Sequence, residues 1–394
     1  MSARPSVGFL GYRRPDGRVG VRNHLLVVPT VICSSVVSER VAAAVAPIGT
    51  ALPHTAGCGQ LGPDMHLTHE TLAAYCGHPN VGAVIVMALG CEQVVAQTLA
   101  DAARAAGKRA HVLAIQSEGG TIRATEKAIV LARELAAELE QAPRETCDIS
   151  ELILSVKCGG SDYTSGLASN PALGRVADRL VDLGGAAVLG EVAEIMGAEH
   201  LLAARAPNAD TAVRLLRVIN RVESEAMALG LDIRGTQPSP GNIRGGLTTI
   251  EEKSLGATHK GGERTPLADV VAYSARITRK GLTVMDTPGL DVESVTGMVG
   301  GGAQAVVFTT GLGTPTGNPI APVIKITGNA RTATSMADNT DIDVSAVLAE
   351  AESFESAAGR VFSDLIEVSS GRPTAAERLG HREFAIHRLS LIHI

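Results

Sequence analysis

The stretch HLLVVPTVI (residues 24–32), followed by SVVSERVAAAVA (residues 35–46), decides the fold class of this chain. The first run is rich in the branched apolar residues of β-strands, and the second has the Ala-rich composition and apolar spacing of a helix. The same pair recurs as GAVIVMAL with EQVVAQTLADAARAAG (residues 82–107), and as HVLAI with a helical pattern over residues 118–140. This alternation predicts βαβ units around a mostly parallel sheet.

The second half of the chain repeats the alternation after a polar interruption, QAPRETCDIS (residues 141–150). We therefore predict an α/β protein of two domains, residues 1–146 and 147–388, each with a mostly parallel sheet flanked by helices in a Rossmann-like variant. A glycine-rich segment without strand signals, residues 235–266, is too long for an idle loop in a compact domain, so we expect it to be functional.

Composition narrows the classes of function. The net charge of −6 has no long basic or acidic run behind it, so neither a nucleic acid nor a membrane is expected as a partner, whereas a small anion is compatible. No apolar stretch reaches about 18 residues and the start of the chain lacks a signal peptide, which predicts a cytoplasmic protein. In that compartment the six cysteines are expected to be thiols or metal ligands rather than disulfides.

The last six residues, LSLIHI (residues 389–394), are what the string CTGTCTCTTATACACATC encodes. That string resembles a transposon-derived sequencing adapter. We therefore expect a non-native tail and leave His393 out of the functional argument.

Three cysteines follow apolar runs or glycine turns, where open α/β sheets place their ligands. Cys58 lies in HTAGCGQ, Cys91 follows VIVMALG and Cys158 follows LILSVK. A neighbouring glycine leaves each thiol accessible to a bound ion or substrate. The alternative is that they are small buried apolar residues, as most free cysteines are. Together they could also hold an iron-sulfur cluster, although no Cys-x-x-Cys spacing supports one.

Histidine and carboxylate side chains near the cysteines supply harder ligands. His54 stands four residues before one cysteine, Glu92 directly follows another, and Glu191 and Glu194 lie three residues apart. If a helix begins near Gly190, both of these carboxylates share a face at its first turn. Oxygen and imidazole ligands together suit Fe(II), Mn(II) or Mg(II). A solvated helix face with ordinary ion pairs is the alternative.

Two glycine-rich polar loops, residues 241–262 and 309–329, carry candidates for substrate binding and proton transfer. An arginine in the first could clamp a carboxylate, and a histidine or lysine at its end could exchange protons. The second offers hydroxyl and amide groups suited to a polyol. An exposed mobile loop would be equally polar, but it would not need so many glycines beside β-branched residues. The candidates from these loops are Asn242, Arg244, Glu251, His259, Lys260 and Asn318.

Two nucleotide-binding signatures are incomplete. DTPG (residues 286–289) looks like the magnesium-binding DxxG of GTPases, but no GxxxxGK[ST] loop exists to hold the phosphates. No convincing GxGxxG follows the first strand. Neither a nucleotide hydrolase nor a dinucleotide enzyme is therefore expected.

Seven ordered blocks resemble the altronate and galactarate dehydratase family over nearly the whole chain. They are GYRRPDGRVGVRNHLLVVPTV, HTAGCGQ, LGCE, KCGGSDYTSGLASNPALG, GEVAEIMGAEHLLAARA, GNIRGGLTTIEEKSLG and GNPIAPVIKITGN. The resemblance implies a hydro-lyase that removes water from a sugar acid, with α/β catalytic domains and dependence on Fe(II) or a similar ion such as Mn(II). Full-length members also carry a small N-terminal SAF-type domain, so the resemblance implies either that a separate small subunit supplies that domain here or that this enzyme works without it.

A related branch, the sulfolactate sulfo-lyases, has a large subunit of similar length and a terminus like GHREF, residues 380–384 here. The cysteine blocks and the ASNPALG run favour a dehydratase over this alternative. A non-catalytic partner subunit is a third hypothesis, which the density of reactive side chains in the glycine-rich blocks opposes. We also expect a homo-oligomer.

Elimination of water requires loss of a weakly acidic proton α to a carboxylate and departure of hydroxide, and a divalent metal assists both steps. We expect the metal to be held by members of one set: His54, Cys58, Cys91, Glu92, Cys158, Glu191 and Glu194. The catalytic candidates are Glu251, His259 and Lys260. The candidates that orient the substrate are Arg22, Asn23, Asn242, Arg244 and Asn318.

Overall fold

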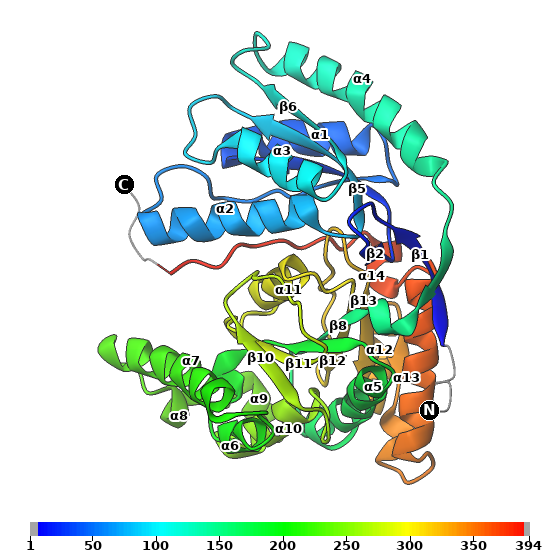
Figure 1. Cartoon of the computed structure of the whole chain (residues 1–394). Helices are drawn as coiled ribbons and strands as arrows, with labels where there is room; N and C mark the ends of the chain where they lie inside the picture. Colours follow the sequence, from blue (N-terminus) through cyan, green and yellow to red (C-terminus); the bar gives the residue numbers. More distant parts are fainter. Residues whose placement is uncertain (1–6, 390–394) are drawn as a thin grey trace.

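The computed structural model describes residues 7–389, in which two parallel sheets are surrounded by helices (Figure 1). This arrangement confirms the predicted α/β class. The first sheet has four parallel strands in the order β4 (Gly49–Ala51), β3 (His24–Pro29), β5 (Val81–Ala88) and β6 (Arg109–Ala114).

Four helices cover the first sheet on both faces: α1 (Ser35–Ala43), α2 (Gly62–Gly77), α3 (Ala96–Ala105) and α4 (Thr121–Glu140). Successive side chains of β3 and β5 point alternately into two hydrophobic cores, one shared with α1 and α4 and the other with α2 and α3. Burial on both faces explains why these strands read as continuous apolar runs.

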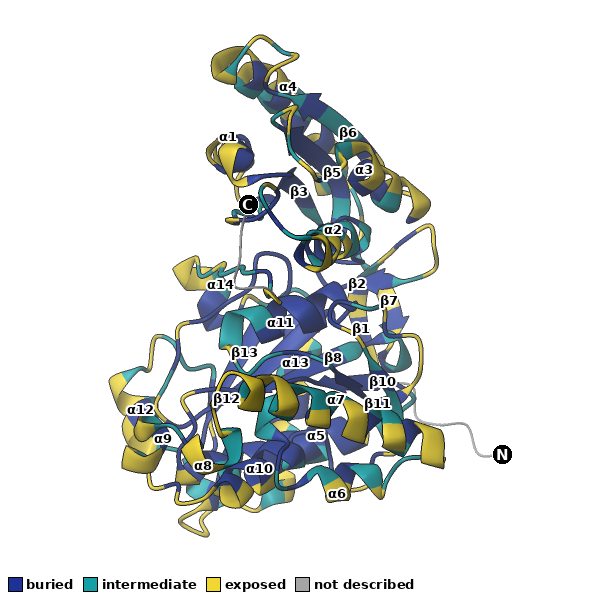
Figure 2. Ribbon diagram, turned by 90° about the vertical axis from the view of Figure 1, so that its left-hand side faces the viewer, coloured by how far each residue is buried: buried dark blue, intermediate teal, exposed yellow. Residues whose placement is uncertain are grey.

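The second sheet has seven parallel strands, and it carries the candidate site described below. Their order is β10 (Leu267–Val271), β11 (Gly281–Met285), β9 (Ala186–Leu189), β8 (Ile153–Cys158), β12 (Ala305–Thr310), β13 (Val323–Thr327) and β14 (Ile342–Asp343). The strands lie at the buried centre of the lower part of the molecule, and the exposed residues gather on the surrounding helices (Figure 2).

Helices α5 (Asn170–Asp182) and α13 (Phe354–Ser369) pack against each other and share a hydrophobic core with one face of this sheet. The other face shares a core with α11 (Asp291–Gly300) and with α2 and α3 of the first half. The two halves of the chain are therefore joined by a common core.

A small antiparallel sheet joins the beginning of the first half of the chain to its end. Its order is β2 (Val19–Gly20), β1 (Gly8–Arg13) and β7 (Glu145–Asp148). The remaining helices are α6 (Glu199–Ala203), α7 (Ala209–Ala228), α8 (Ile233–Thr236), α9 (Pro240–Arg244), α10 (Ile250–His259), α12 (Ala330–Ser335) and α14 (Ala375–Leu379).

The glycine-rich segment 235–266 folds largely as the short helices α8 to α10 rather than as an extended loop. The division of the chain at residue 146 stays a prediction. Of the expected non-native tail, residues 390–394 lie outside the described residues. None of the helices within residues 7–389 has both the length and the apolar character needed to span a membrane.

Gly174 lets α5 lie directly against the end of α10. A Cβ built at Gly174 lies 2.1 Å from the carbonyl oxygen of His259, so alanine cannot fit unless the two helices separate. We expect Gly174→Ala to lower the free energy of unfolding by about 1–3 kcal/mol, as measured by urea unfolding.

Gly359, in the middle of α13, is the matched control for this substitution. A Cβ there meets nothing within 4 Å. Gly359→Ala should therefore raise the free energy of unfolding by about 0.5–1 kcal/mol, because alanine favours the helix. Equal destabilisation by both substitutions would contradict the packing argument.

Candidate active site

The carboxyl ends of the seven parallel strands meet along one edge of the second sheet. From β8 the chain continues to β9 on one side, and it later returns on the other side of β8 as β12. Open α/β sheets bind ligands where the strand order reverses in this way. The reversal coincides with Lys157 and Cys158, the last two residues of β8.

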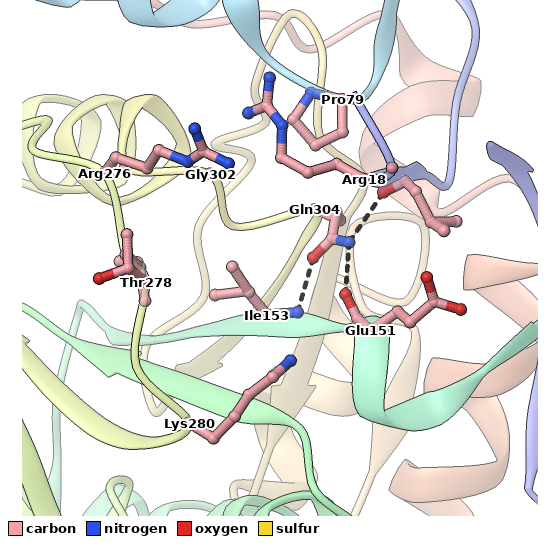
Figure 3. Close-up of a pocket in the computed structure, with 13 residues that line it drawn as sticks. Arg18, Pro79, Glu151, Ile153, Arg276, Thr278, Lys280, Gly302 and Gln304 are labelled. Atoms are coloured by element: carbon pink, nitrogen blue, oxygen red, sulfur yellow. Dashed lines mark hydrogen bonds between the residues drawn. The ribbon is translucent and has the colours of Figure 1, made fainter. Parts of the chain in front are cut away.

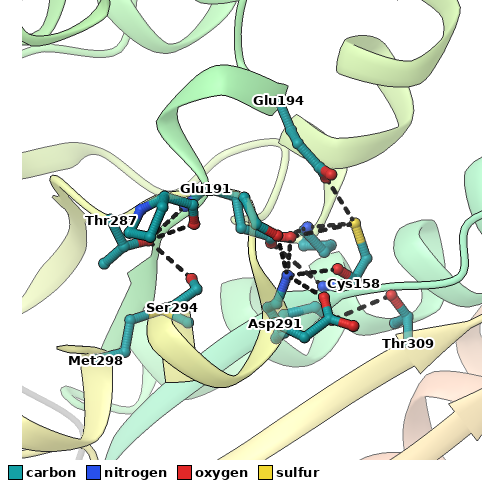
Figure 4. A network of polar contacts seen from close by, with 12 residues as sticks. Cys158, Glu191, Glu194, Thr287, Asp291, Ser294, Met298 and Thr309 are labelled. Carbon is teal, nitrogen blue, oxygen red and sulfur yellow. Dashed lines mark hydrogen bonds and ion pairs between the residues drawn. The ribbon is translucent and has the colours of Figure 1, made fainter. Parts of the chain in front are cut away.

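A group of charged side chains, here called the Cys158 cluster, gathers at this point (Figure 4). Its members come from the end of β8, the turn and short 3₁₀ helix that follow β9, the start of α11, and the interior and the end of α10. They are Lys157, Cys158, Glu191, Glu194, Lys253, Lys260 and Asp291.

Glu191 is the centre of the cluster. One of its carboxylate oxygens pairs with Lys157 Nζ, and the other lies 2.7 Å from Lys260 Nζ. The side chains of both lysines are 0% exposed and that of Glu191 is 1% exposed. Lys157 Nζ also lies 2.8 Å from Asp291 Oδ1. Buried charges are tolerated only when they are paired in this way.

Cys158 connects this buried centre to a more accessible carboxylate. Lys260 Nζ donates to Cys158 Sγ at 2.7 Å, and the thiol lies 3.4 Å from Glu194 Oε2. The other oxygen of Glu194 lies 3.1 Å from Lys253 Nζ. The side chains of Glu194 and Asp291 are 15% and 31% exposed, so the cluster meets solvent on their side.

The electrostatics assign a protonation state to the buried groups. Burial opposes ionisation of Glu191, but the ammonium groups of Lys157 and Lys260 hold its pKa below the ordinary range. Burial likewise opposes the charged lysines, yet the neighbouring acidic groups raise the pKa of both above the usual value. Burial, reinforced by Glu191, raises the pKa of Cys158 to about 12. The cluster therefore contains a carboxylate, two ammonium groups and a neutral thiol at its core.

The backbone at Glu191 differs from the sequence-based expectation. No α-helix begins near Gly190; Glu191 adopts a left-handed conformation (φ 63°, ψ 53°), and a short 3₁₀ helix follows at Val192–Glu194. Thr287 Oγ1 accepts the Glu191 N–H at 2.7 Å and helps to hold this conformation. The expectation that both carboxylates share an α-helical face is therefore wrong, but the turn still directs both to Cys158. Strained backbone of this kind concentrates at functional sites.

Three members of the cluster fit a divalent metal ion by the chemistry of their donors. A ligand atom from each of Cys158, Glu191 and Glu194 lies within 4.8 Å of the others, and within residues 7–389 they are the only such group of three. A thiolate with two carboxylates suits a transition metal such as Fe(II). Lys260 Nζ contacts two of these atoms, so an ion held there would replace these contacts of the lysine.

The other predicted metal ligands lie in loops of the first sheet. Both ring nitrogens of His54 already bond to backbone, to Pro29 O at 2.8 Å and to Ala56 N at 3.1 Å. Glu92 accepts hydrogen bonds from Thr30 and from the backbone around residue 90. Cys58 and Cys91 are exposed whereas Cys158 is buried. Across the described residues, none of these four side chains joins Cys158 in a group of metal ligands.

Three predicted substrate-binding residues have partners within the protein. Arg22 pairs with Glu377 at 2.7 Å and donates to backbone carbonyls near the C-terminal helices. Asn23 accepts a hydrogen bond from Arg14 and donates to a carbonyl of α4. Asn318 donates to the Tyr75 hydroxyl at 3.0 Å. Within residues 7–389, no hydrogen bond or ion pair joins any of the three to the Cys158 cluster.

The candidates of the segment 241–262 divide into two groups. Lys260 lies in the Cys158 cluster, and Asn242 accepts a hydrogen bond from Lys253, a member of the cluster, at 3.3 Å. Arg244 and Glu251 are exposed. His259 Nδ1 is buried and, as far as residues 7–389 show, has no hydrogen-bond partner.

Sequence reasoning missed Lys157, Lys253 and Asp291. A lysine that ends the apolar run LILSV was a usable signal, because a charge at a strand end of an α/β sheet faces the ligand edge. No comparable signal marked Asp291, which reaches the cluster through the position of α11.

Comparisons with known proteins extend over nearly the whole chain. The family described as D-galactarate/Altronate dehydratase, C-terminal, matches residues 149–392, and the one described as D-galactarate dehydratase/Altronate hydrolase, second domain, matches residues 11–140.

Individual relatives cover this chain almost completely. The (2R)-sulfolactate sulfo-lyase subunit beta of Chromohalobacter salexigens is 41% identical over 97% of this chain and 97% of its own length. Altronate dehydratase of Bacillus subtilis is 36% identical over 96% of this chain and 77% of its own length. Galactarate dehydratase (L-threo-forming) of Escherichia coli is 32% identical over 96% of this chain and 76% of its own length.

Proposed function

We propose, since this chain belongs to the D-galactarate/altronate dehydratase family, that it is a hydro-lyase which converts a sugar acid such as D-altronate or galactarate to a 2-keto-3-deoxy acid. The relatives named above are all lyases, and this chain is a lyase with them. The observation that carries the proposal is the Cys158 cluster, which holds acidic and cationic groups together at the ligand-binding edge of the sheet.

Elimination of water moves two protons. The proton at C2, beside the substrate carboxylate, must be accepted by a base, and the hydroxyl at C3 must leave with a proton as water. Glu194 is the accessible carboxylate and is assigned as the base. Lys260 is assigned as the acid, because its amine is protonated. Lys157, fixed between Glu191 and Asp291, keeps its charge and stabilises the negative charge that develops on the substrate.

The metal implied by the family resemblance would be held by Cys158, Glu191 and the Oε2 atom of Glu194, which lies beside Cys158, and the other oxygen of Glu194 would remain free to accept the proton. A divalent ion such as Fe(II) or Mn(II), when bound, polarises the substrate carboxylate and the departing hydroxyl. Lys260 would then turn from Cys158 and Glu191 toward the substrate. Cys158 would lose its proton, because the thiolate is the ligand form.

Removal of metal tests this assignment. Chelated protein is expected to lose activity on altronate or galactarate and to regain it with Fe(II) under reducing conditions. Full activity of protein shown to be free of metal by elemental analysis would contradict metal dependence.

The position of the metal is tested by Fe(II) binding itself. Glu194→Gln should weaken binding by about tenfold or more, because it removes a charged ligand. Glu92→Gln is the matched control, since Glu92 belongs to the set of predicted ligands in the first half. The opposite pattern would place the metal in the first half.

A (2R)-sulfolactate sulfo-lyase is the second candidate function. It is favoured by the relative from Chromohalobacter, which matches this chain over 97% of both lengths and is called subunit beta. In this case the group that leaves C3 is sulfite instead of hydroxide, and a small partner subunit completes the enzyme.

One assay separates the two candidates. Purified protein with Fe(II) is incubated with altronate, galactarate and sulfolactate, with 2-keto acid and sulfite measured in each reaction. A 2-keto acid from a sugar acid supports the dehydratase. Sulfite from sulfolactate alone would overturn it in favour of the sulfo-lyase, and the same panel is repeated with any small subunit encoded nearby.

A further inference from the structure

A cavity of about 290 Å³ lies at the edge of the seven-stranded sheet opposite the Cys158 cluster (Figure 3). Its wall includes Ile153, the first residue of β8, and Lys280, directly before β11. Ile153 and Cys158 are the two ends of β8, which at about 3.3 Å per residue places them roughly 16 Å apart. The cavity is therefore separate from the candidate active site.

Three cationic side chains line this cavity: Arg18, Arg276 and Lys280. Figure 3 shows Arg18 and Arg276 on one side and Lys280 on the other. Arg18 comes from the turn between β1 and β2, whereas the other two come from the loop before β11. Groups from distant parts of the sequence thus present the same sign of charge to one space.

The carboxylates nearby are already paired. Glu151, which also lines the cavity, lies 2.8 Å from Arg13, and Asp16 accepts a hydrogen bond from Arg18 at 2.8 Å. Within residues 7–389, Arg276 makes no hydrogen bond and no ion pair. Lys280 donates to the carbonyl of Ser150 and has no carboxylate within 4 Å in the same range. Arg276 and Lys280, which are both exposed, therefore lack a carboxylate partner of their own, although Glu151 contributes one negative charge to the same wall.

The side-chain amide of Gln304, a neutral polar group in the wall, shapes the cavity. Gln304 donates to the carbonyls of Val19 and Glu151 at 2.8 and 2.9 Å and accepts the N–H of Ile153 at 2.6 Å. These contacts use its amide, so it fixes the wall and does not bind a ligand. Thr278, which also lines the cavity and is labelled in Figure 3, is exposed. Recognition at this place would rest on charge.

We propose that this cavity binds a small dianion, one that carries a phosphate group or two carboxylates. Arg276 and Lys280 would donate charge-assisted hydrogen bonds to the oxygens of the dianion, and the dianion would balance their positive charge. Arg18 would contribute through Nη1, because its Nε and Nη2 atoms already bond to Asp16 and to the carbonyl of Gly77. Because the ligand would join the turn between β1 and β2 to the loop before β11, its binding would stabilise the folded protein.

Isothermal titration of the whole chain with inorganic phosphate and, separately, with malonate tests the proposal. We expect saturable binding of at least one of these dianions. Arg276→Gln and Lys280→Gln should each weaken the Kd by about tenfold or more, because each removes a charge-assisted hydrogen bond. Binding of phosphate alone or malonate alone identifies the anionic group that the cavity accepts.

Arg279→Gln is the matched control, because Arg279 is an exposed arginine that pairs with Asp269 at 3.5 Å and does not line the cavity. It should leave the Kd within about twofold of the wild-type value. Lys260→Met locates the bound anion. This variant should still bind the dianion if the site is this cavity, and it should lose binding if the site is the Cys158 cluster. Absence of binding, equal loss in all three glutamine variants, or loss in Lys260→Met alone would overturn the proposal.

Discussion

Glu191→Gln is expected to abolish lyase activity and to lower the free energy of unfolding by about 3–5 kcal/mol. Glu191 is the carboxylate that pairs with two fully buried lysines, so the amide would leave Lys157 with one partner and Lys260 facing an uncharged oxygen. Removal of one partner from a buried ion pair is costly because the remaining charge stays desolvated. Urea unfolding and the 2-keto acid assay measure the two effects.

Glu225→Gln makes the same chemical change in a surface ion pair. Glu225 is 61% exposed and lies 2.8 Å from Arg221 one helical turn away. Such a pair contributes about 0–1 kcal/mol, so this control should keep both stability and activity. If the two variants are equally stable, the buried network does not hold the fold at this point.

The pH dependence of stability provides an independent readout for Glu191. Its pKa in the folded protein lies below the ordinary value of 4.5, so its contribution is complete above pH 4.5 and is lost as the pH falls through the folded pKa. The difference in unfolding free energy between the wild type and Glu191→Gln should therefore be largest near pH 7 and shrink below pH 4.5. A constant difference between pH 7 and pH 3 would contradict the assigned charge.

The fold was accessible from the sequence because hydrophobic periodicity reports burial directly. The strands of both sheets are buried on two faces, which makes them continuous apolar runs, and the helices between them keep one apolar side. The conformation of the segment 235–266 was not accessible, because its many glycines weaken the helical pattern and two of its three helices have only four or five residues.

The candidate site was predicted in part. Cys158, Glu191, Glu194 and Lys260 all belonged to the predicted set, and the structure brings these four together. Polar blocks in a sequence do not reveal which side chains face a ligand and which hold the protein together. Arg22, for example, lies in a block as polar as any other, yet its guanidinium binds Glu377 and three backbone carbonyls.

Lys157 shows the other limit of sequence reasoning. It lies next to Cys158 in the chain, but its importance depends on Glu191 and Asp291, which approach it from β9 and α11. Pairing between distant segments is a property of the sheet order, and that order reverses at β8. A single sequence contains no local pattern for such a reversal.

Lys260→Met should lower kcat by about 10²- to 10⁴-fold, the range expected when a positioned general acid is removed. Methionine has a similar length and no charge, so it vacates the positions near Cys158 and Glu191 without a large change in volume. Lys260→Arg keeps the charge but gives up a proton far less readily, so it should retain the KM and lose kcat. An unfolded fraction would also lower the apparent kcat at unchanged KM, so the folded fraction of each variant is measured at the assay temperature.

Lys108→Met is the control that separates burial from chemistry. Lys108 is also a buried lysine, 6% exposed, and it donates to the carbonyls of Cys76 and His78 in the first half. Its loss should lower stability and leave kcat unchanged, whereas Lys260→Met should lower kcat at a temperature where both variants are fully folded. If kcat falls equally in both variants, the effect comes from the fold. If kcat falls in neither variant, another group donates the proton that leaves with the hydroxyl. Lys260 then serves only to neutralise Glu191.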